Sequence, residues 1–384
     1  MTSETLSAIN VGAEILGYVS PCLLSAGLAA AVLLCLAACW WAADLSTRFP
    51  GKSWERKAPG DVGLNEAKLQ EFIEKLTVLA DDRKYGPTKE KPESYGCVIK
   101  DGYMVATWGE PSSKFTWFSS SKPVLTTLLF YAIQEGRLRG VDDRIADWGW
   151  NLSTKDQSMT FAHLANMCSG YSLKDPPGAA YAYNDYGIHL YALTLDRVLG
   201  GKRLNEPAAV LFQDLQLEDG EVFGATQKGY GVVTSARDFA RIGWFWMHRG
   251  NWAGRAVLRR DFFDRYMKAT VPLTLPVSTD KETDDYLHIE SYGGGNNQLA
   301  YGPGIYGFCW WFNAPLPATS QPNWPYCPPD TFASLGYNGN NMIMIPSRNL
   351  LVAARANWQK VCGEGADSHC NRLLLKTLLE AVEA

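Results

Sequence analysis

The chain has little clustered positive charge, and this excludes one broad class of partner. Its 384 residues carry a formal net charge of −4, and no block of Lys and Arg stands out. A nucleic-acid-binding surface needs a basic patch that neutralises phosphates. We therefore expect no nucleic-acid partner and favour a small-molecule or short peptide substrate.

Several catalytic and metal-binding motifs are also missing. The sequence contains no G-x-S-x-G elbow, no H-E-x-x-H, no C-x-x-C and no glycine loop of the phosphate-binding type. Its five histidines are scattered without ligand spacing: His163, His189, His248, His288 and His369. A metal centre or a Ser-His-Asp triad therefore has no support, and we expect no metal and no cofactor.

One long apolar run differs from the rest of the chain. No charged residue occurs from Ile15 to Ala43, and a membrane helix needs about 20 apolar residues. Within the run, Leu36-Ala37-Ala38-Cys39 resembles a bacterial lipobox, so Cys39 is a candidate for lipidation. We expect residues 1–44 to be a membrane anchor or signal segment and residues 45–61 to be a polar linker.

Charges and cysteines point to different locations for the catalytic part. Only Glu4 and Glu14 precede the apolar run, whereas Lys and Arg residues follow it, which favours a cytoplasmic catalytic part. Against this, six of the nine cysteines lie in the body, and Cys362 and Cys370 would close a short polar loop as a disulfide. We favour an exported, membrane-tethered protein with a periplasmic or extracellular catalytic part. The alternative is reduced, buried cysteines behind a reversed anchor.

The body mixes strand and helix patterns. Residues 94–109 predict a hairpin around Asp101-Gly102, and residues 235–250 predict a helix that Ser235 caps and Gly250 ends. Further helices are expected at residues 62–80 and 370–384, and further strands at residues 304–313, 341–347 and 349–358. Strands that flank a helical middle predict an α+β fold, an antiparallel sheet flanked by helices. Its α/β part would cover about residues 62–140 and 300–384, and the inserted, mainly helical part about 141–299.

The motif Ser119-Ser120-Ser121-Lys122 is the strongest chemical signal. On a helix, S-x-x-K spacing places the hydroxyl and the amine one turn apart on one face. The helix that follows is apolar nearly all round, and burial would lower the Lys122 pKa from about 10.4 and make the amine a base. The alternative is that the serines only cap the helix. A second copy, Ser278 to Lys281, lies among charges and is expected to be a solvated loop.

Five segments in order resemble the serine β-lactamase and penicillin-binding-protein superfamily, specifically its class C β-lactamase-like branch. That branch also holds esterases, D-amino-acid peptidases and aminohexanoate-oligomer hydrolases. The resemblance runs from about Val62 to the C-terminus, and it implies the β-lactamase/transpeptidase-like fold. The segments are "FSSSKPVLTTLLFYAIQEGRLRGVDDRI", "MTFAHLANMCSGY", "AYNDYGIHLYALTLDRVLGG", "GYGVVTSARDFARIGWFWMHRGNWAGRAVL" and "FASLGYNGNNMIMIPSRNLLVAARAN".

The resemblance implies a role for individual residues. Ser119 would be the acylated nucleophile, Lys122 its activating amine and Tyr183 the phenol that shuttles protons. The backbone N–H groups of Ser119 and Tyr337 would form the oxyanion hole. Ser120 and Ser121 remain the better candidates for helix capping.

Two departures from the family pattern concern the substrate. Asp185 stands where the second motif ends in Asn, and its acid could pair with Lys122 and raise the Lys122 pKa, or bind a cationic substrate group. Ser334-Leu335-Gly336 replaces the basic residue that opens the third motif, so a carboxylate-bearing β-lactam or D-Ala peptide is less expected than a neutral ester or small amide. The expected substrate-binding residues are Asp185, Ser334, Gly336, Asn340 and Trp310, with Trp311 and Asn341 as neighbours. The alternative for Asn340, Asn341 and the two tryptophans is a structural role.

The sequence therefore favours a serine hydrolase that acts through an acyl-enzyme on a neutral ester or small amide. Within enzymes, the alternatives are a β-lactamase or a D-Ala peptidase. Outside enzymes, the alternative is a sensor or scaffold that keeps the fold without turnover. The presence of Ser119, Lys122 and Tyr183 together favours the hydrolase.

Overall fold

The computed structural model describes residues 47–77, 94–201, 203–224, 231–280, 282–291, 296–297, 302–316, 319–356, 358 and 372–383. Contacts divide the chain into two units, Met1–Arg48 and Phe49–Ala384. The predicted membrane segment, Cys39 and the predicted Cys362–Cys370 pair lie outside the described residues. Within the described ranges, no helix is both long and apolar enough to cross a membrane.

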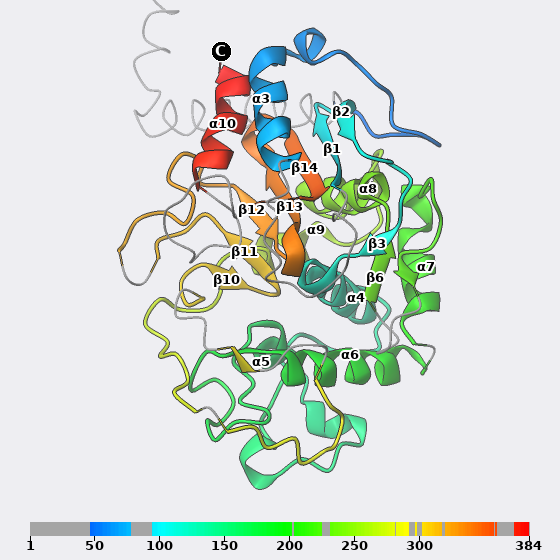
Figure 1. The fold of residues 1–384 in the computed structure, drawn as a ribbon. Helices are drawn as coiled ribbons and strands as arrows, with labels where there is room; N and C mark the ends of the chain where they lie inside the picture. Colours follow the sequence, from blue (N-terminus) through cyan, green and yellow to red (C-terminus); the bar gives the residue numbers. More distant parts are fainter. Residues whose placement is uncertain are drawn as a thin grey trace, which may run out of the picture. The chain divides into compact units, whose positions relative to one another are not determined.

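A seven-stranded sheet forms the centre of the second unit (Figure 1). Its strand order is β10-β11-β12-β13-β14-β1-β2, and each neighbouring pair is antiparallel. The strands are β1 (Tyr95–Lys100), β2 (Tyr103–Trp108), β10 (Tyr306–Gly307), β11 (Trp310–Phe312), β12 (Phe332–Ser334), β13 (Asn340–Ile345) and β14 (Leu350–Arg355). The predicted hairpin is confirmed: Asp101 and Gly102 both have positive φ, as its tight turn requires.

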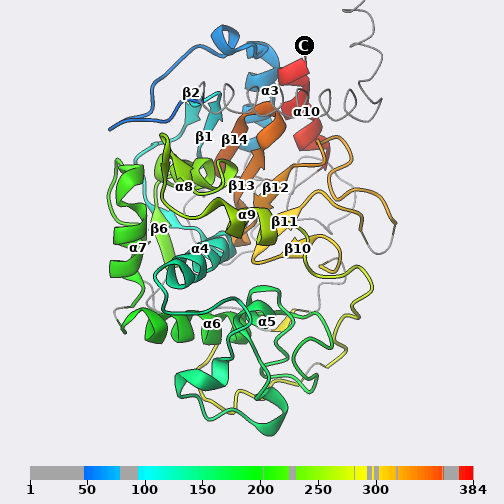
Figure 2. The same ribbon diagram turned by 180° about the vertical axis from the view of Figure 1, so that it is seen from behind.

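Helices cover both faces of this sheet. Helices α3 (Glu66–Thr77) and α10 (Arg372–Glu383) lie on one face, and α8 (Ala236–Met247) lies on the other (Figures 1 and 2). Strand β13 is buried at every position, as expected for a strand that is covered on both sides. Gly243 permits the close approach of α8, because a Cβ there would lie 2.4 Å from the Met342 sulfur.

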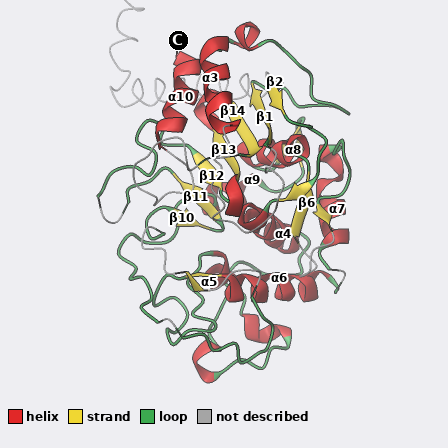
Figure 3. Ribbon diagram, in the orientation of Figure 1, coloured by secondary structure: helices red, strands yellow, loops and turns green. Residues whose placement is uncertain are grey.

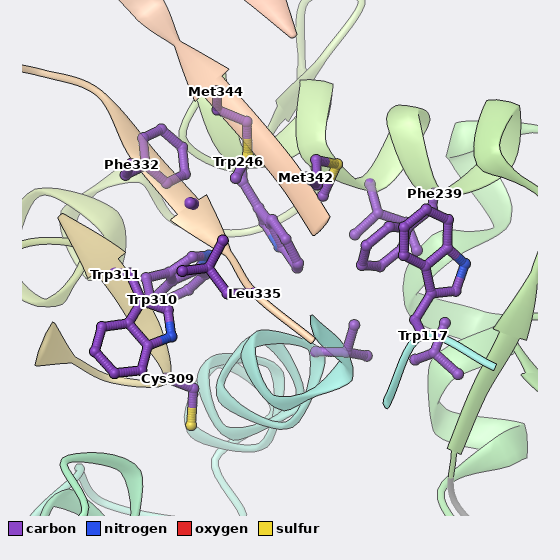
Figure 4. Packing of buried hydrophobic residues seen from close by; sticks show 14 of the residues in the cluster. Trp117, Phe239, Trp246, Cys309, Trp310, Trp311, Phe332, Leu335, Met342 and Met344 are labelled. Carbon is purple, nitrogen blue, oxygen red and sulfur yellow. The ribbon is translucent and has the colours of Figure 1, made fainter. Parts of the chain in front are cut away.

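Helix α4 (Lys122–Gln134) runs between the sheet and the helical part of the unit (Figure 1). Ten of its residues are buried, as its apolar sequence predicted: Lys122, Pro123, Val124, Leu125, Thr126, Thr127, Leu128, Leu129, Phe130 and Ala132. Figure 4 shows the core beside it, where Trp246 and Trp310 lie between α8 and the strands. Trp246 Nε1 donates a hydrogen bond of 2.9 Å to Thr127 Oγ1, which ties α8 to α4.

The inserted part consists of short helices joined by long loops (Figure 3). Its helices are α5 (Phe161–Ala165), α6 (Asp185–Leu199), α7 (Asn205–Phe212) and α9 (Arg260–Tyr266), and α8 follows the predicted helix that Ser235 caps. Strand β3 (Phe115–Thr116), which precedes this part, forms a three-stranded sheet with β6 (Gly231–Thr234) and β5 (Phe223–Gly224). Two strand pairs lie in the inserted part: β4 (Tyr183–Asn184) with β9 (Asn296–Asn297), and β7 (Asn251–Trp252) with β8 (Arg255–Ala256). The 3-10 helices are η1 (Pro59–Val62), η2 (Phe118–Ser121), η3 (Ile145–Trp148), η4 (Thr154–Asp156), η5 (Gln213–Leu215), η6 (Tyr337–Gly339) and η7 (Pro346–Arg348). The α+β fold with a sheet flanked by helices is confirmed.

The stretch predicted as a linker contacts the body from Phe49 onward. Arg241 Nη1 donates to the Gly51 carbonyl at 2.9 Å, and Arg241 Nη2 donates to the Lys52 carbonyl at 3.2 Å. Trp54 Nε1 donates to the Arg237 carbonyl at 3.0 Å. The second unit begins at Phe49, before the predicted start at Val62, and the buried Arg241 on α8 binds the backbone of Gly51 and Lys52.

The described cysteines are buried and free. They are Cys97, Cys168, Cys309 and Cys327. Burial raises the pKa of the Cys97 and Cys168 thiols to about 12, so both stay protonated at neutral pH. These residues pack as small apolar side chains.

Candidate active site

A strained turn carries Ser119 at the entrance to α4. Phe118 has a φ of 48°, in the left-handed region that non-glycine residues rarely adopt. The preceding Trp117 is fixed on β6, since its backbone N–H donates to the Val232 carbonyl at 3.0 Å and its Nε1 donates to the Thr234 carbonyl at 3.1 Å. The turn is therefore held by buried contacts and leaves Ser119 partly exposed.

Ser120 and Ser121 hold this turn against neighbouring strands. Ser120 Oγ donates to the Ser334 carbonyl at 2.9 Å and also contacts the Asn340 carbonyl, while Ser121 Oγ accepts from the Val232 N–H at 3.3 Å. Neither hydroxyl caps α4. The prediction that these serines are caps is wrong, because strand groups distant in sequence lie within their reach.

Lys122 lies at the centre of the site. Its Nζ donates to Ser119 Oγ at 2.6 Å and lies 2.9 Å from Asp185 Oδ1. The same atom lies 4.8 Å from the centre of the Tyr183 ring. Only 1% of the Lys122 side chain is exposed, so the ammonium is stabilised by these groups instead of by bulk water.

The charge on Lys122 is strongly favoured. Burial lowers the Lys122 pKa, but the Asp185 carboxylate and the Tyr183 oxygen oppose it, and the net result is a raised pKa. The prediction that burial makes Lys122 a neutral base is therefore wrong. The alternative prediction, that Asp185 pairs with Lys122 and raises its pKa, is confirmed.

Tyr183 lies beside the hydroxyl and the amine. Burial raises its pKa, whereas the charge of Lys122 and hydrogen bonds with Ser119 and Lys122 lower it; the net pKa is raised, and the phenol is neutral at pH 7. Its ring stacks on Trp311 with centroids 5.9 Å apart. The next residue, Asn184, accepts hydrogen bonds from the first turn of α6 and so fixes Asp185 in that turn.

The third motif approaches the nucleophile turn closely at Gly336. A Cβ on Gly336 would lie 2.5 Å from the Trp117 carbonyl oxygen and 2.7 Å from the Asn340 carbonyl oxygen. The Gly336 N–H donates to Asn341 Oδ1 at 3.0 Å, which fixes the peptide between Leu335 and Gly336, one peptide before that of Tyr337. The segment that carries Tyr337 therefore lies directly beside the turn of Ser119.

Three of the predicted substrate-binding residues are fully buried. Ser334, Asn340 and Trp310 each have 0% exposure. Asn340 Nδ2 donates to the Tyr337 carbonyl at 2.6 Å, and the Trp310 ring contacts Trp246 at 5.5 Å. In this structure the Asn340 and Trp310 side chains support the site and the core and present no surface to a substrate, which corrects their expected placement.

Two exposed aromatic side chains lie next to Ser119. From the sequence, Tyr337 is expected at the site only through its backbone N–H, and Phe118 is not predicted as a site residue. Phe118 is 39% exposed and Tyr337 is 51% exposed, and their rings meet edge to face at 5.8 Å. Periodicity gives no sign of them, because both occupy irregular turns. The one available signal was position, since Phe118 directly precedes Ser119 and Tyr337 directly follows Gly336.

The second S-x-x-K copy has a different environment. Ser278 is buried, and its hydroxyl donates to Asp175 Oδ2 at 2.5 Å. Lys281 lies outside the described residues. Ser278 therefore belongs to a buried loop contact instead of the solvated loop that was predicted. Across the described residues, no group of three or more His, Cys, Asp or Glu side chains is arranged to hold a metal ion.

Comparison with known proteins identifies the family. A profile of the Beta-lactamase family matches residues 88–369, more than half of the chain. The chain belongs to the beta-lactamase family. An uncharacterized protein of Alkalihalophilus pseudofirmus is 22% identical over 277 residues, which cover 64% of this chain and 74% of that protein.

Solved structures agree on the fold of this beta-lactamase family member. A candidate beta-lactamase from Bacteroides dorei superposes with a TM-score of 0.57 at 16% identity, over 76% of this chain and 93% of that one. EstCE1, a hydrolase with promiscuous acyltransferase activity, superposes with a TM-score of 0.53 at 15% identity, over 83% of this chain and 97% of that one. The beta-lactamase-type fold predicted from the five segments is therefore confirmed.

Proposed function

We propose that this beta-lactamase family member is a serine hydrolase that acts through an acyl-enzyme on neutral esters or small amides. The observation that carries the proposal is the contact of 2.6 Å between Lys122 Nζ and Ser119 Oγ, in a buried site that also holds Tyr183. A hydroxyl, an amine and a phenol within hydrogen-bonding reach can together move the proton that nucleophilic attack releases.

In the proposed reaction, Ser119 Oγ attacks the carbonyl carbon of the substrate. The backbone N–H groups of Ser119 and Tyr337 would stabilise the oxyanion, since the Gly336 contact brings the two segments together. Tyr183, a neutral phenol, would deliver a proton to the leaving group and then help to activate the water that hydrolyses the acyl-enzyme. A single hydrogen-bond donor to the oxyanion is worth about 10²- to 10³-fold in kcat.

Charge and surface chemistry support a neutral substrate. Lys122 is already paired with Asp185, and Ser334-Leu335-Gly336 brings no basic side chain to the third motif. A β-lactam or a D-Ala peptide would need a cation for its carboxylate. The exposed rings of Phe118 and Tyr337 beside Ser119 instead favour an apolar group on an ester or amide.

For location, we propose an exported, membrane-tethered protein with an extracytoplasmic catalytic part. The uncharged run from Ile15 to Ala43 supports the tether, and the spacing of Cys362 and Cys370 in a short polar loop supports the export. Fractionation of the full chain, with protease added to spheroplasts, tests this proposal. Recovery in the soluble fraction, or protection of the catalytic part from protease, would contradict it.

Labelling with a fluorophosphonate probe and turnover of p-nitrophenyl butyrate test the catalytic assignment. Ser119→Ala is expected to abolish both, because it removes the nucleophile. Ser278→Ala, at the other S-x-x-K copy, is the matched control and should keep both. Labelling of another residue, or turnover by Ser119→Ala at the wild-type rate, would refute the proposal. A burst of acylation without a steady state would instead indicate the sensor.

A further inference from the structure

The Asp185 carboxylate lies inside the site, but the reaction proposed above gives it no role. Its Oδ1 is 2.9 Å from Lys122 Nζ, and the two side chains are 9% and 1% exposed. The same Nζ is 2.6 Å from Ser119 Oγ, so the amine bridges the hydroxyl and the carboxylate. Burying an ion pair carries a desolvation penalty that its attraction does not always repay, so stability alone is a weak explanation for this pair.

The fold holds Asp185 in this position. The residue occupies the first turn of α6, and Asn184 caps that helix by accepting from the Tyr186 N–H at 2.9 Å and the Gly187 N–H at 3.1 Å. A helix N-terminus also favours a negative charge. The carboxylate is therefore fixed in orientation and stabilised as an anion facing Lys122.

The ion pair creates a difficulty for a mechanism in which Lys122 alone is the base. The Asp185 carboxylate raises the Lys122 pKa despite burial, so the side chain is an ammonium at neutral pH. An ammonium has no lone pair and cannot accept the Ser119 proton. It can pass the proton on only if it gives up one of its own in the same step.

We propose that Ser119, Lys122 and Asp185 form a proton relay in which the carboxylate is the final acceptor. This inference rests on the proposed hydrolase function. As the bond between Oγ and the substrate carbonyl carbon forms, the Oγ–H proton passes to Nζ, and one Nζ proton passes to Oδ1. When the intermediate collapses, the bond to the leaving alkoxide breaks and the proton returns from Oδ1 through Nζ, with the Tyr183 hydroxyl available as the final donor. Lys122 remains an ammonium, and Asp185 is a carboxylate again.

Other titratable groups close to the relay do not compete for the proton. Burial raises the Cys309 pKa to about 11, and burial also raises the Tyr306 pKa well above its ordinary value, so both stay neutral. Tyr183 has a raised pKa as well. His189, one turn along α6 from Asp185, directs its Nδ1 to the Glu290 carbonyl at 2.9 Å. Asp185 acts through Lys122 and is thus a positioning residue that also holds the proton.

The pH dependence of fluorophosphonate labelling at Ser119 tests the relay. In the wild type, the labelling rate is first measured against pH, and the acid limb of that profile is the reference for the variants. In Asp185→Asn the base must be the Lys122 amine itself, so the acid limb of the pH profile should move to more alkaline pH by more than about one unit. At the pH where the wild-type limb has its midpoint, labelling of this variant should be at least about tenfold slower. Asp185→Glu should restore the wild-type limb. Melting temperatures of the variants show whether each is folded.

Four outcomes separate the explanations. An acid limb that Asp185→Asn leaves in place would overturn the relay but not the hydrolase. An effect of Asp185→Asn confined to KM for a cationic ester would also overturn it, and would assign Asp185 to substrate binding. Wild-type protein that is labelled at a residue other than Ser119 would overturn both proposals. A moved limb that Asp185→Glu restores supports the relay, because a merely structural role would not shift a pH profile.

Discussion

Replacing Arg241 by Met is expected to lower the free energy of unfolding by about 3–5 kcal/mol, the range found when one partner of a buried ion pair is removed. Arg241 lies on α8 and is 0% exposed. Its Nη1 donates to the Leu215 carbonyl at 2.8 Å and to the Gly51 carbonyl at 2.9 Å. Its Nη2 donates to Glu218 Oε1 at 3.0 Å and to the Lys52 carbonyl.

The magnitude follows from what the substitution leaves behind. Met fills much of the volume, but the buried Leu215 carbonyl and the Glu218 carboxylate lose the Arg241 donor, as do the carbonyls of the exposed residues Gly51 and Lys52. Hydrogen bonds to charged groups contribute about 1.5–3 kcal/mol each, and leaving a buried acceptor unpaired costs about 1–3 kcal/mol. Arg237 still lies 3.4 Å from Glu218, which keeps the loss near the range for a single broken pair. For a typical domain this is a large share of the 5–15 kcal/mol of total stability.

Urea unfolding followed by tryptophan fluorescence measures the effect. Arg241→Lys should be intermediate, because an ammonium keeps the charge but loses the planar fork. Arg139→Ala is the control, since that side chain is 86% exposed and should leave the midpoint unchanged. Trypsin should cleave Arg241→Met after Lys52 below its unfolding midpoint, since Arg241 holds that segment. A midpoint for Arg241→Met equal to that of the wild type would refute the reasoning.

Two further predictions concern the oxyanion segment and pH. Gly336→Ala should reduce kcat/KM at least about tenfold, since the new Cβ would lie 2.5 Å from the Trp117 carbonyl oxygen and must displace backbone. Gly140→Ala is the control, because no atom lies within 4 Å of a Cβ at that position. Equal kcat/KM for the two variants would contradict this prediction. Burial raises the Asp238 pKa from 3.8 to about 6, so the folded state binds more protons than the unfolded state between these pH values. Protonation of Asp238 therefore stabilises the folded state below about pH 4, and this stabilisation is lost as the pH rises through 6. The wild type minus Asp238→Asn difference in unfolding free energy should therefore fall by about 2 kcal/mol from pH 4 to 7. A difference that does not change over this range would contradict the raised pKa.

Local chemistry made some of this structure predictable from the sequence. Asp101-Gly102 predicts its hairpin because the turn needs positive φ, and Ser235 predicts the start of α8 because its hydroxyl satisfies the Asp238 N–H. The order of the five segments predicted the fold, and the Asp185 departure predicted the ion pair with Lys122. In each of these cases the feature depends on residues that are close together in the sequence or on a motif that can be recognised in it.

Contacts between distant segments could not be predicted in the same way. Ser120 satisfies the capping rule by composition, yet the carbonyls of Ser334 and Asn340 lie within its reach. Trp310 and Trp311 are adjacent in a strand, so their side chains point to opposite faces, and pattern alone did not show which ring reaches Tyr183. The pKa of Lys122 depends on whether burial or the Asp185 charge has the larger effect. That comparison requires the distance between Lys122 Nζ and Asp185 Oδ1, which the sequence does not give.

The left-handed backbone at Phe118 makes this position suitable for engineering the site. Its φ of 48° suits glycine better than phenylalanine, and such strain costs of order 1 kcal/mol or more. The ring is exposed and contacts Tyr337 at the surface, outside the buried core. A saturation library at residue 118 would therefore vary the shape beside the nucleophile while the core stays intact. Selectivity and folding can be altered separately at this residue.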